Sequence, residues 1–187
     1  MTPAVFLDRD GTILDELGYL TPDSALHVYP YSLDAIRVLS TSGFLVIVIT
    51  NQGGIGLGLY DAAFVERTHA ALDARVGAAG GRVAAWHYCP HHPEAVVPAL
   101  RQVCECRKPA AGLVRRAAQE HDIDLARSWV VGDQWRDIEV AHRTGARSIL
   151  VRTGYGRRAE HAWPADIEPP TFVADNLIAA AARILSP

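Results

Sequence analysis

The sequence has little cysteine, no long apolar run and no excess of charge of one sign. Only three cysteines occur among its 187 residues, and because the chain starts without a basic and apolar leader, we expect no framework of disulfides and a reducing, cytoplasmic setting. No apolar stretch approaches the roughly 20 residues that span a bilayer. The net charge is -3, which gives no electrostatic reason to expect a nucleic acid or a membrane as partner.

What the sequence does contain is an alternation of short apolar runs and helix-period segments. Its length fits one domain over residues 1–187. Short runs rich in β-branched or aromatic residues predict strands at 4–7, 44–49, 83–88, 128–131, 148–151 and 171–174. Apolar spacing predicts helices at 32–42, 61–79, 110–121, 135–144 and 176–185. The alternation indicates an α/β fold with a doubly wound parallel sheet and helices on both faces.

Several residues mark where these elements begin and end. Asp61 suits an N-cap, and Gly43 and Gly145 suit left-handed helix ends. Residues 154–170 contain three prolines and several charges, so we expect a surface loop there. Residues 11–31, between the first strand and the first helix, suffice for a flap and not for a separate cap domain.

The segment Asp8-Arg9-Asp10-Gly11-Thr12 follows the first predicted strand directly. Two carboxylates one residue apart at the end of a buried strand repel each other unless a cation or a shifted proton compensates. In an α/β sheet ligands bind at this end of the strands, so one carboxylate could attack an electrophile while the other moves a proton. The alternative is an ordinary turn, in which Asp and Gly are common.

Two more polar clusters point to an anion at the same edge of the sheet. Thr50-Asn51-Gln52-Gly53-Gly54 follows the second strand and offers a hydroxyl, amides and turn N–H groups that can hold phosphate oxygens, unless it is only a turn. Arg107-Lys108-Pro109 is predicted to open the third helix, with Pro109 at or near its first turn. Cations there oppose the helix dipole, so a bound anion explains them better than helix stability does; a solvated basic pair is the alternative.

A third cluster, running from Gly132 to Asp137, places acids after the fourth strand. Asp133 could join Asp8 and Asp10 in an oxygen site suited to Mg²⁺. Asp137 could instead cap or support the neighbouring helix, and capping is an alternative for both acids.

The cysteines lie close to histidines and to the basic pair. Cys89-Pro90-His91-His92 and Cys104-Glu105-Cys106 form CxH and CxC pairs on either side of a loop. Three thiolates and one imidazole make a closed tetrahedral zinc site with a structural role. We prefer His91 over His92 as the fourth ligand; the alternative is a set of reduced thiols near incidental histidines.

The four polar clusters occur in the order DxDGT, TNQ, RKP and GDxxxD. This order resembles the haloacid dehalogenase superfamily of phosphatases along nearly the whole chain. The resemblance implies that Asp8 is the nucleophile that forms an aspartyl-phosphate, that Asp10 is the acid and base, and that Thr50 and Lys108 orient the phosphate. It also implies a Mg²⁺ site made by Asp8, Asp133 and Asp10, the last through its carbonyl.

The loop 89–106, with DRDGT, GYL at 18–20, TNQGGIG and CRKP, is similar to the D-glycero-D-manno-heptose-1,7-bisphosphate 7-phosphatase family. That family is capless, and the resemblance implies Mg²⁺-dependent hydrolysis of the 7-phosphate of a sugar bisphosphate in the biosynthesis of nucleotide-activated heptose. It implies a zinc site at Cys89, His91, Cys104 and Cys106. It also implies these substrate contacts: Glu16, Leu17, Gly18, Tyr19, Asn51, Gln52, Gly53 and Arg107.

Two positions depart from that family, and two other functions compete. Gln134 stands where relatives often carry Lys, and Gly53 where they often carry Ser. A histidinol-phosphate phosphatase shares the superfamily motifs and a zinc loop, but the GYL segment, the NQGGIG run and the spacing from His91 to Cys104 favour the heptose enzyme. The other alternative is a zinc-stabilised binding module without turnover. We expect a monomer, because no helix has a surplus apolar face.

Overall fold

The computed structural model describes residues 1–22 and 24–186, and its strands form one parallel sheet. The strands are β1 (Ala4–Leu7), β2 (Leu45–Asn51), β3 (Ala85–Cys89), β4 (Trp129–Gly132), β5 (Arg147–Val151) and β6 (Phe172–Ala174). Their order across the sheet is β3-β2-β1-β4-β5-β6, and every neighbouring pair is parallel. This confirms the doubly wound parallel sheet.

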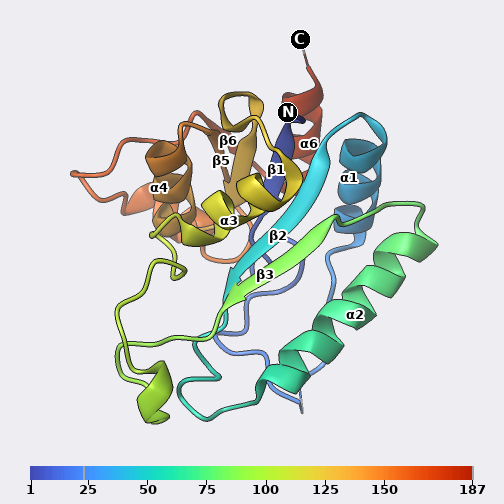
Figure 1. Ribbon diagram of the computed structural model, residues 1–187. Helices are drawn as coiled ribbons and strands as arrows, with labels where there is room; N and C mark the ends of the chain where they lie inside the picture. The colour runs from blue at the N-terminus through green and yellow to red at the C-terminus, as the bar shows by residue number, and fades with distance from the viewer. Residues whose placement is uncertain (23, 187) are drawn as a thin grey trace.

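Helices cover both faces of the sheet (Figure 1). They are α1 (Pro30–Thr41), α2 (Ala62–Ala78), α3 (Gly112–His121), α4 (Trp135–Thr144), α5 (Gly156–His161) and α6 (Leu177–Leu185), with short 3-10 turns at Pro98–Leu100 and Leu125–Arg127. The apolar residues of α1 and α6 belong to one core cluster and those of α3 and α4 to a second cluster. In the part of the chain that the structure describes, no helix is long and apolar enough to cross a membrane.

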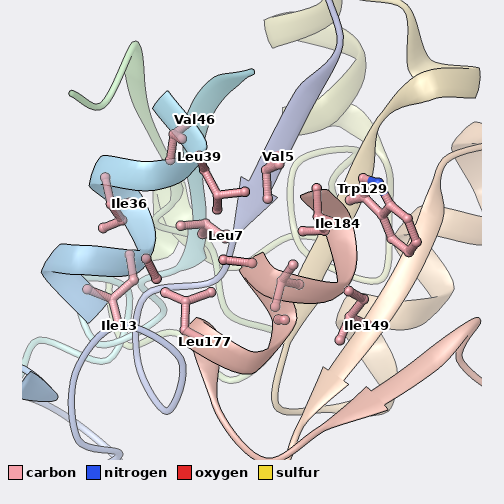
Figure 2. Packing of buried hydrophobic residues seen from close by; sticks show 14 of the residues in the cluster. Val5, Leu7, Ile13, Ile36, Leu39, Val46, Trp129, Ile149, Leu177 and Ile184 are labelled. Atoms are coloured by element: carbon pink, nitrogen blue, oxygen red, sulfur yellow. The ribbon is translucent and has the colours of Figure 1, made fainter. Parts of the chain in front are cut away.

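Strand β1 lies at the centre of the fold and is fully buried on both faces. Its side chains alternate: Val5 and Leu7 pack with α1 and α6, as Figure 2 shows, whereas Ala4 and Phe6 pack in the cluster on the opposite face. The order of the strands reverses at β1, which is paired with β2 on one side and with β4 on the other. Such a switch point opens a crevice at the carboxyl ends of the strands, where Asp8 follows β1.

The predicted ends of several elements are confirmed. Asp61 caps α2, since its Oδ1 accepts a hydrogen bond from the N–H of Phe64 at 2.7 Å. Gly43 and Gly145 adopt the left-handed backbone that ends α1 and α4, with φ of 88° and 74°.

Two element boundaries near the site were predicted wrongly. Strand β2 was predicted to end at residue 49, but it continues through Thr50 and Asn51. These two residues pair with Tyr88 and Cys89 of β3, so the backbone pairing extends beyond the apolar residues. Helix α3 begins at Gly112, so Pro109 is not in its first turn. The peptide bond Lys108-Pro109 is cis, and the amides of 110 and 112 bond back to the carbonyls of 107 and 105. The basic pair therefore lies in a turn before the helix.

The expected surface loop at 154–170 contains the short helix α5. Its prolines all lie after the helix, and Arg152 anchors the helix through Glu160, with Nε–Oε2 and Nη2–Oε1 distances of 2.7 and 2.8 Å. The prolines therefore constrain only the second half of the segment.

A candidate active site at the carboxyl ends of β1, β2 and β4

Three buried carboxylates meet where β1 and β4 end. Ligand oxygens of Asp8, Asp133 and Asp137 all lie within 4.8 Å of one another. Burial, with the charges of Asp137 and Asp10, raises the pKa of Asp8 to about 6 despite the nearby Lys108. Burial, with the charges of Asp8 and Asp137, raises the pKa of Asp133 to about 9. The cluster therefore carries more negative charge than its surroundings stabilise, and a cation would relieve it.

Lys108 supplies one positive charge to this cluster. Its Nζ lies 2.8 Å from Asp8 Oδ1 and 2.7 Å from Asp137 Oδ1, and it donates a hydrogen bond to the Ile49 carbonyl at 3.0 Å. Burial lowers the pKa of Lys108, but the two carboxylates more than reverse this and leave the pKa raised. The lysine therefore stays charged and is aimed at the Asp8 carboxylate. Asp137 also accepts a hydrogen bond from the N–H of Gln134 at 3.1 Å, so it supports both the lysine and the start of α4.

Asn51 positions Lys108 through the backbone. Its Nδ2 donates to the Lys108 carbonyl at 3.1 Å, and its Oδ1 accepts from the Lys108 N–H at 3.0 Å. Both ends of the amide are used by one peptide segment. The side chain that sequence reasoning assigned to the substrate thus holds the turn that carries the lysine.

Asp133 has one oxygen that is satisfied and one that is not. Its Oδ2 accepts a hydrogen bond from the N–H of Tyr155 at 2.7 Å. Its Oδ1 is buried and has no hydrogen-bond partner among the described residues. A Cβ on Gly11 or on Gly154 would lie 2.2 or 2.3 Å from Oδ2, so only glycine fits beside this carboxylate. An unpartnered buried oxygen beside Asp8 suits a divalent cation that prefers oxygen ligands.

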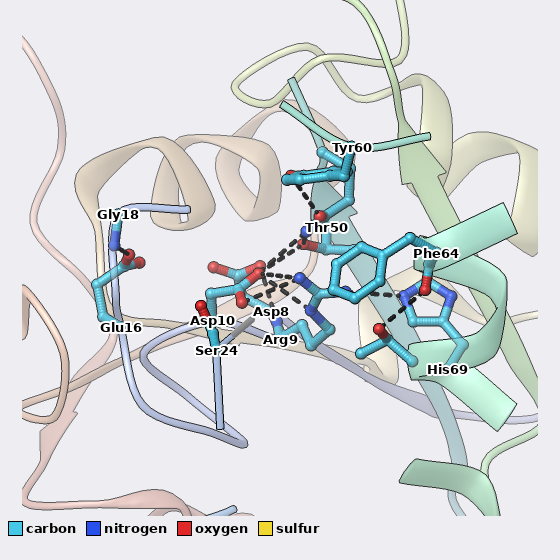
Figure 3. A network of polar contacts seen from close by, with 12 residues as sticks. Asp8, Arg9, Asp10, Glu16, Gly18, Ser24, Thr50, Tyr60, Phe64 and His69 are labelled. Atoms are coloured by element: carbon cyan, nitrogen blue, oxygen red, sulfur yellow. Dashed lines mark hydrogen bonds and ion pairs between the residues drawn. The ribbon is translucent and has the colours of Figure 1, made fainter. Parts of the chain in front are cut away.

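The Asp10 side chain is not among the three clustered carboxylates and takes part in a network of polar contacts with Arg9 and Thr50 (Figure 3). The Arg9 guanidinium binds both of its oxygens, with Nε to Oδ2 at 3.1 Å and Nη2 to Oδ1 at 3.0 Å. Thr50 Oγ1 and Gln52 Nε2 lie 3.4 and 3.0 Å from Oδ2. Gln52 also accepts a hydrogen bond from the Tyr60 hydroxyl at 3.0 Å. These contacts fix the orientation of the Asp10 carboxylate. The family resemblance assigns the backbone carbonyl of Asp10, and not this carboxylate, to Mg²⁺.

Sequence reasoning missed the residues behind Asp10. Arg9 is 1% exposed, and its Nη1 lies 3.4 Å from Nε2 of His69 on α2. The His69 ring stacks on Trp86, with ring centroids 4.8 Å apart. Burial, with the Arg9 charge, lowers the pKa of His69 to about 4 and keeps the imidazole neutral. The position of Arg9 directly after a buried strand could have indicated that this residue belongs to the site. His69 is a single histidine within a predicted helix, and nothing in the sequence around it indicated the contact with Arg9.

The nominated zinc ligands come together beside β3. The Sγ atoms of Cys89, Cys104 and Cys106 and Nδ1 of His91 lie 3.1 to 3.6 Å apart in their close pairs. These separations are close to those across a tetrahedral ion with bonds of about 2.0 to 2.3 Å. His92 is engaged elsewhere, since its Nδ1 accepts a hydrogen bond from the N–H of Glu94 at 3.1 Å.

Arg107 connects this cluster to the active site. Its Nη1 donates to the His91 carbonyl at 2.9 Å. A Cβ on Gly53 would lie 3.0 Å from the same nitrogen and 3.0 Å from His92 Cδ2, so a larger residue at Gly53 would press on both. The departure at Gly53 thus leaves room for this arrangement of Arg107.

A cleft of about 600 Å³ opens beside the carboxylates. Of the nominated substrate contacts, Glu16, Gly18, Tyr19 and Arg107 line it, and Gln134 lines it as well. Leu17 is exposed and lies outside this lining set, and Gln52 is buried in the Asp10 network. A second hollow of about 590 Å³, beside Tyr60 and Ile55, is mostly apolar and contains none of the predicted contacts. The first cleft is therefore the candidate substrate site.

The fold and the site define a hydrolase of the haloacid dehalogenase class, and residues 105–180 match the family model described as HAD-hydrolase-like. The chain is 38% identical to a Pseudomonas putida D-glycero-β-D-manno-heptose-1,7-bisphosphate 7-phosphatase over 97% of this chain and 98% of that protein. It is 40% identical to the Escherichia coli protein of the same name over 81% of this chain and 80% of that protein.

Two solved structures resemble this chain over nearly its whole length. The structure of the B. bronchiseptica D,D-heptose 1,7-bisphosphate phosphatase complexed with magnesium and phosphate superposes with a TM-score of 0.87 at 34% identity over 98% of each chain. The Burkholderia thailandensis enzyme gives a TM-score of 0.74 at 33% identity over 99% of each chain. The chain belongs to the D-glycero-β-D-manno-heptose-1,7-bisphosphate 7-phosphatase family.

Proposed function

We propose that this chain is a Mg²⁺-dependent phosphatase that removes the 7-phosphate of D-glycero-D-manno-heptose 1,7-bisphosphate, on the route to nucleotide-activated heptose. One observation carries the proposal: Lys108 joins two buried carboxylates, Asp8 and Asp137, next to the unpartnered oxygen of Asp133. The names of the relatives, and the magnesium and phosphate bound by the B. bronchiseptica enzyme, support the substrate and the metal.

Asp8, Asp133 and the carbonyl of Asp10 would hold the Mg²⁺. The unpartnered Asp133 oxygen and the raised pKa values of both acids support this ligand set. When bound, the ion would draw negative charge from the phosphoryl oxygens and so permit a carboxylate to approach a phosphate.

The side chains of this chain perform the steps of the reaction. A carboxylate oxygen of Asp8 attacks phosphorus, the bond from phosphorus to the sugar oxygen breaks, and Asp10 gives its proton to the leaving alcohol. Asp10 then takes a proton from water, which attacks the aspartyl-phosphate, releases inorganic phosphate and restores Asp8. Lys108 offsets the charge of the phosphoryl group, and the Thr50 hydroxyl donates a hydrogen bond to it.

The zinc site has a structural role in this proposal. Four protein ligands, Cys89, His91, Cys104 and Cys106, would complete a tetrahedral Zn²⁺ and leave no position open to substrate. The ion would fix the loop 89–106 and, through the bond from Arg107 to the His91 carbonyl, the position of that arginine. We propose further that residues 1–187 form one phosphatase domain that acts as a monomer.

Parallel turnover assays on the heptose bisphosphate and on histidinol phosphate test the function. We expect the heptose bisphosphate to be hydrolysed with the higher kcat/KM, and release of only the 7-phosphate, which phosphorus NMR of the product would show. A clear preference for histidinol phosphate would overturn the proposal in favour of that enzyme. Absence of turnover on both, with Mg²⁺ present, would point to a binding module instead.

A further inference from the structure

Three potential metal ligands meet between β3 and α3 and form a group separate from the cysteine cluster and the carboxylate cluster. They are His87, in the middle of β3, and Glu120 and His121, the last two residues of α3. One ligand atom from each residue lies within 4.8 Å of the other two. The proposed mechanism uses none of these side chains, and none of them lines the substrate cleft.

The His87 imidazole faces α3 without a hydrogen-bond partner for one of its nitrogens. Ala85 and Cys89, two residues before and after it on β3, pack with Leu113 and other apolar residues of α3, so the alternation along the strand directs His87 to the same helix. Its Nε2 is buried and makes no hydrogen bond within the described residues. Glu120 Oε2 lies 3.5 Å from this nitrogen, which is longer than a normal hydrogen bond. A metal ion bound by both atoms would satisfy the imidazole nitrogen.

The spacing and the chemistry of the three side chains suit an ion of the zinc type. Ligand atoms around a tetrahedral ion with bonds of about 2.0 to 2.2 Å lie about 3.3 to 3.6 Å apart. His87 Nε2 and Glu120 Oε2 already have this separation. His121 is half-buried at the end of its helix and needs at most a small side-chain movement to complete the set. Two imidazoles and one carboxylate are ligands that Zn²⁺ and related transition-metal ions accept.

The surroundings of Glu120 leave one of its oxygens directed at His87. Arg116, one turn earlier on α3, donates a hydrogen bond from Nε to Glu120 Oε1 at 2.8 Å and so orients the carboxylate with Oε2 toward the imidazole. The charge of Arg116 opposes a cation, but its side chain is 69% exposed, so solvent screens this charge. Glu120 and His121 also lie at the carboxyl end of α3, where the helix dipole favours a cation.

We propose that His87, Glu120 and His121 form a second metal site, which binds Zn²⁺ or a related divalent transition-metal ion. Three protein ligands leave one position for water, so this ion exchanges with solvent more readily than an ion held by four protein ligands. The bound ion would join β3, which ends at Cys89, to α3, which follows the turn that carries Lys108. This inference does not depend on the proposed function, because it uses no residue of the active site.

Isothermal titration calorimetry with Zn²⁺ tests the proposal. The protein carries no histidine tag, is already loaded with zinc at the cysteine cluster, and is kept in excess Mg²⁺ to fill the carboxylate site. We expect about one further Zn²⁺ per chain to bind with a micromolar Kd. His121→Gln and Glu120→Gln should each weaken this binding at least about tenfold, because even residues that only orient a ligand contribute that much.

His142→Gln is the matched control and should bind the further Zn²⁺ as the wild type does. His142 is also a half-buried histidine in the last turn of a ten-residue helix, α4, and it belongs to no group of potential metal ligands among the described residues.

Thermal unfolding gives a second readout. Zn²⁺ should raise the melting temperature of the wild type and of His142→Gln but not of His121→Gln, because the ion binds only where the folded chain brings β3 and α3 together. If the wild type binds no further ion at Zn²⁺ concentrations up to about 1 mM, or if His121→Gln binds it as tightly as the wild type, the proposal is wrong. His87 and Glu120 would then form an ion pair only.

Discussion

The Arg9 guanidinium donates a hydrogen bond to each carboxylate oxygen of Asp10, with distances of 3.1 and 3.0 Å. Arg9 itself is almost fully buried. Arg9, which lies between Asp8 and Asp10 in the sequence, therefore fixes the orientation of the Asp10 carboxylate, and in the proposed mechanism this would set the direction from which Asp10 gives its proton to the leaving alcohol. The planar guanidinium of arginine can bind both carboxylate oxygens at once and so fix their orientation, whereas the ammonium group of lysine cannot.

The variant Arg9→Lys should lower kcat by about tenfold to a hundredfold while KM changes little. The charge is kept, but the fork that orients Asp10 is lost. Steady-state kinetics measure this effect, and a thermal melt in parallel shows whether the buried lysine also destabilises the fold. A normal kcat in a folded Arg9→Lys enzyme would show that Asp10 needs no such orientation.

The variant Asp8→Asn should release no phosphate at any Mg²⁺ concentration and should remain folded. The amide keeps the shape of the carboxylate but is not a nucleophile, and it removes one like charge from a buried acidic cluster. Phosphate release and circular dichroism measure the two results. Asp34→Asn, at an exposed position on α1, is the matched control. Unchanged turnover in Asp8→Asn would exclude the aspartyl-phosphate mechanism.

The variant Asp137→Asn should lower kcat by about tenfold and the free energy of unfolding by about 2 kcal/mol. It weakens the 2.7 Å ion pair that aims Lys108 at Asp8, although Asp8 still partners the lysine. Glu139→Gln on the same helix is the control, since its exposed pair with Arg143 should contribute less than about 1 kcal/mol. Equal effects of the two substitutions would contradict the role given to Asp137.

Metal analysis of purified protein should find about one tightly bound zinc per chain. Cys106→Ser should lose this zinc and lower the melting temperature. It should also raise KM for the bisphosphate, because Arg107 depends on the His91 carbonyl for its position. Protein without zinc but with normal stability would show that the four residues are not a metal site.

The free energy of unfolding should fall as the pH drops from about 6.5 toward 4, in part because of His69. Its pKa is lowered to about 4 in the folded state, so the unfolded chain takes up a proton in this window and the folded chain does not. The stability is complete above the unfolded pKa, and the loss reaches about 3 kcal/mol near pH 4. His69→Gln should make the stability less dependent on pH, as urea unfolding at several pH values would show. An unchanged slope would mean that His69 titrates normally.

Local sequence patterns predicted where the strands lie along the chain and that they form a doubly wound parallel sheet, and they located the four polar clusters at the ends of strands or the starts of helices. They did not predict contacts across the sheet. Asn51 serves the Lys108 backbone and Arg9 meets His69, and such pairings depend on which strands become neighbours. The end of β2 was also misplaced, since hydrogen bonding to β3 and not hydrophobicity sets it. The substrate contacts and the zinc ligands stay predictions until the assays are done.

Gly11 and Gly154 both lie against the Asp133 carboxylate, although they are far apart in the sequence. This has a consequence for how much of the chain must be synthesised before the site can form. The Thr153 hydroxyl donates to the Gly11 carbonyl at 2.6 Å, and the N–H of Tyr155 completes the Asp133 carboxylate. The ribosome makes Asp8 early, but the residues that contact Gly11 and Asp133 lie more than 140 positions later in the chain. A ribosome-bound fragment that ends before Tyr155 thus carries Asp8 without the contacts that hold Asp133, so the proposed activity requires that the chain has been made at least as far as residue 155.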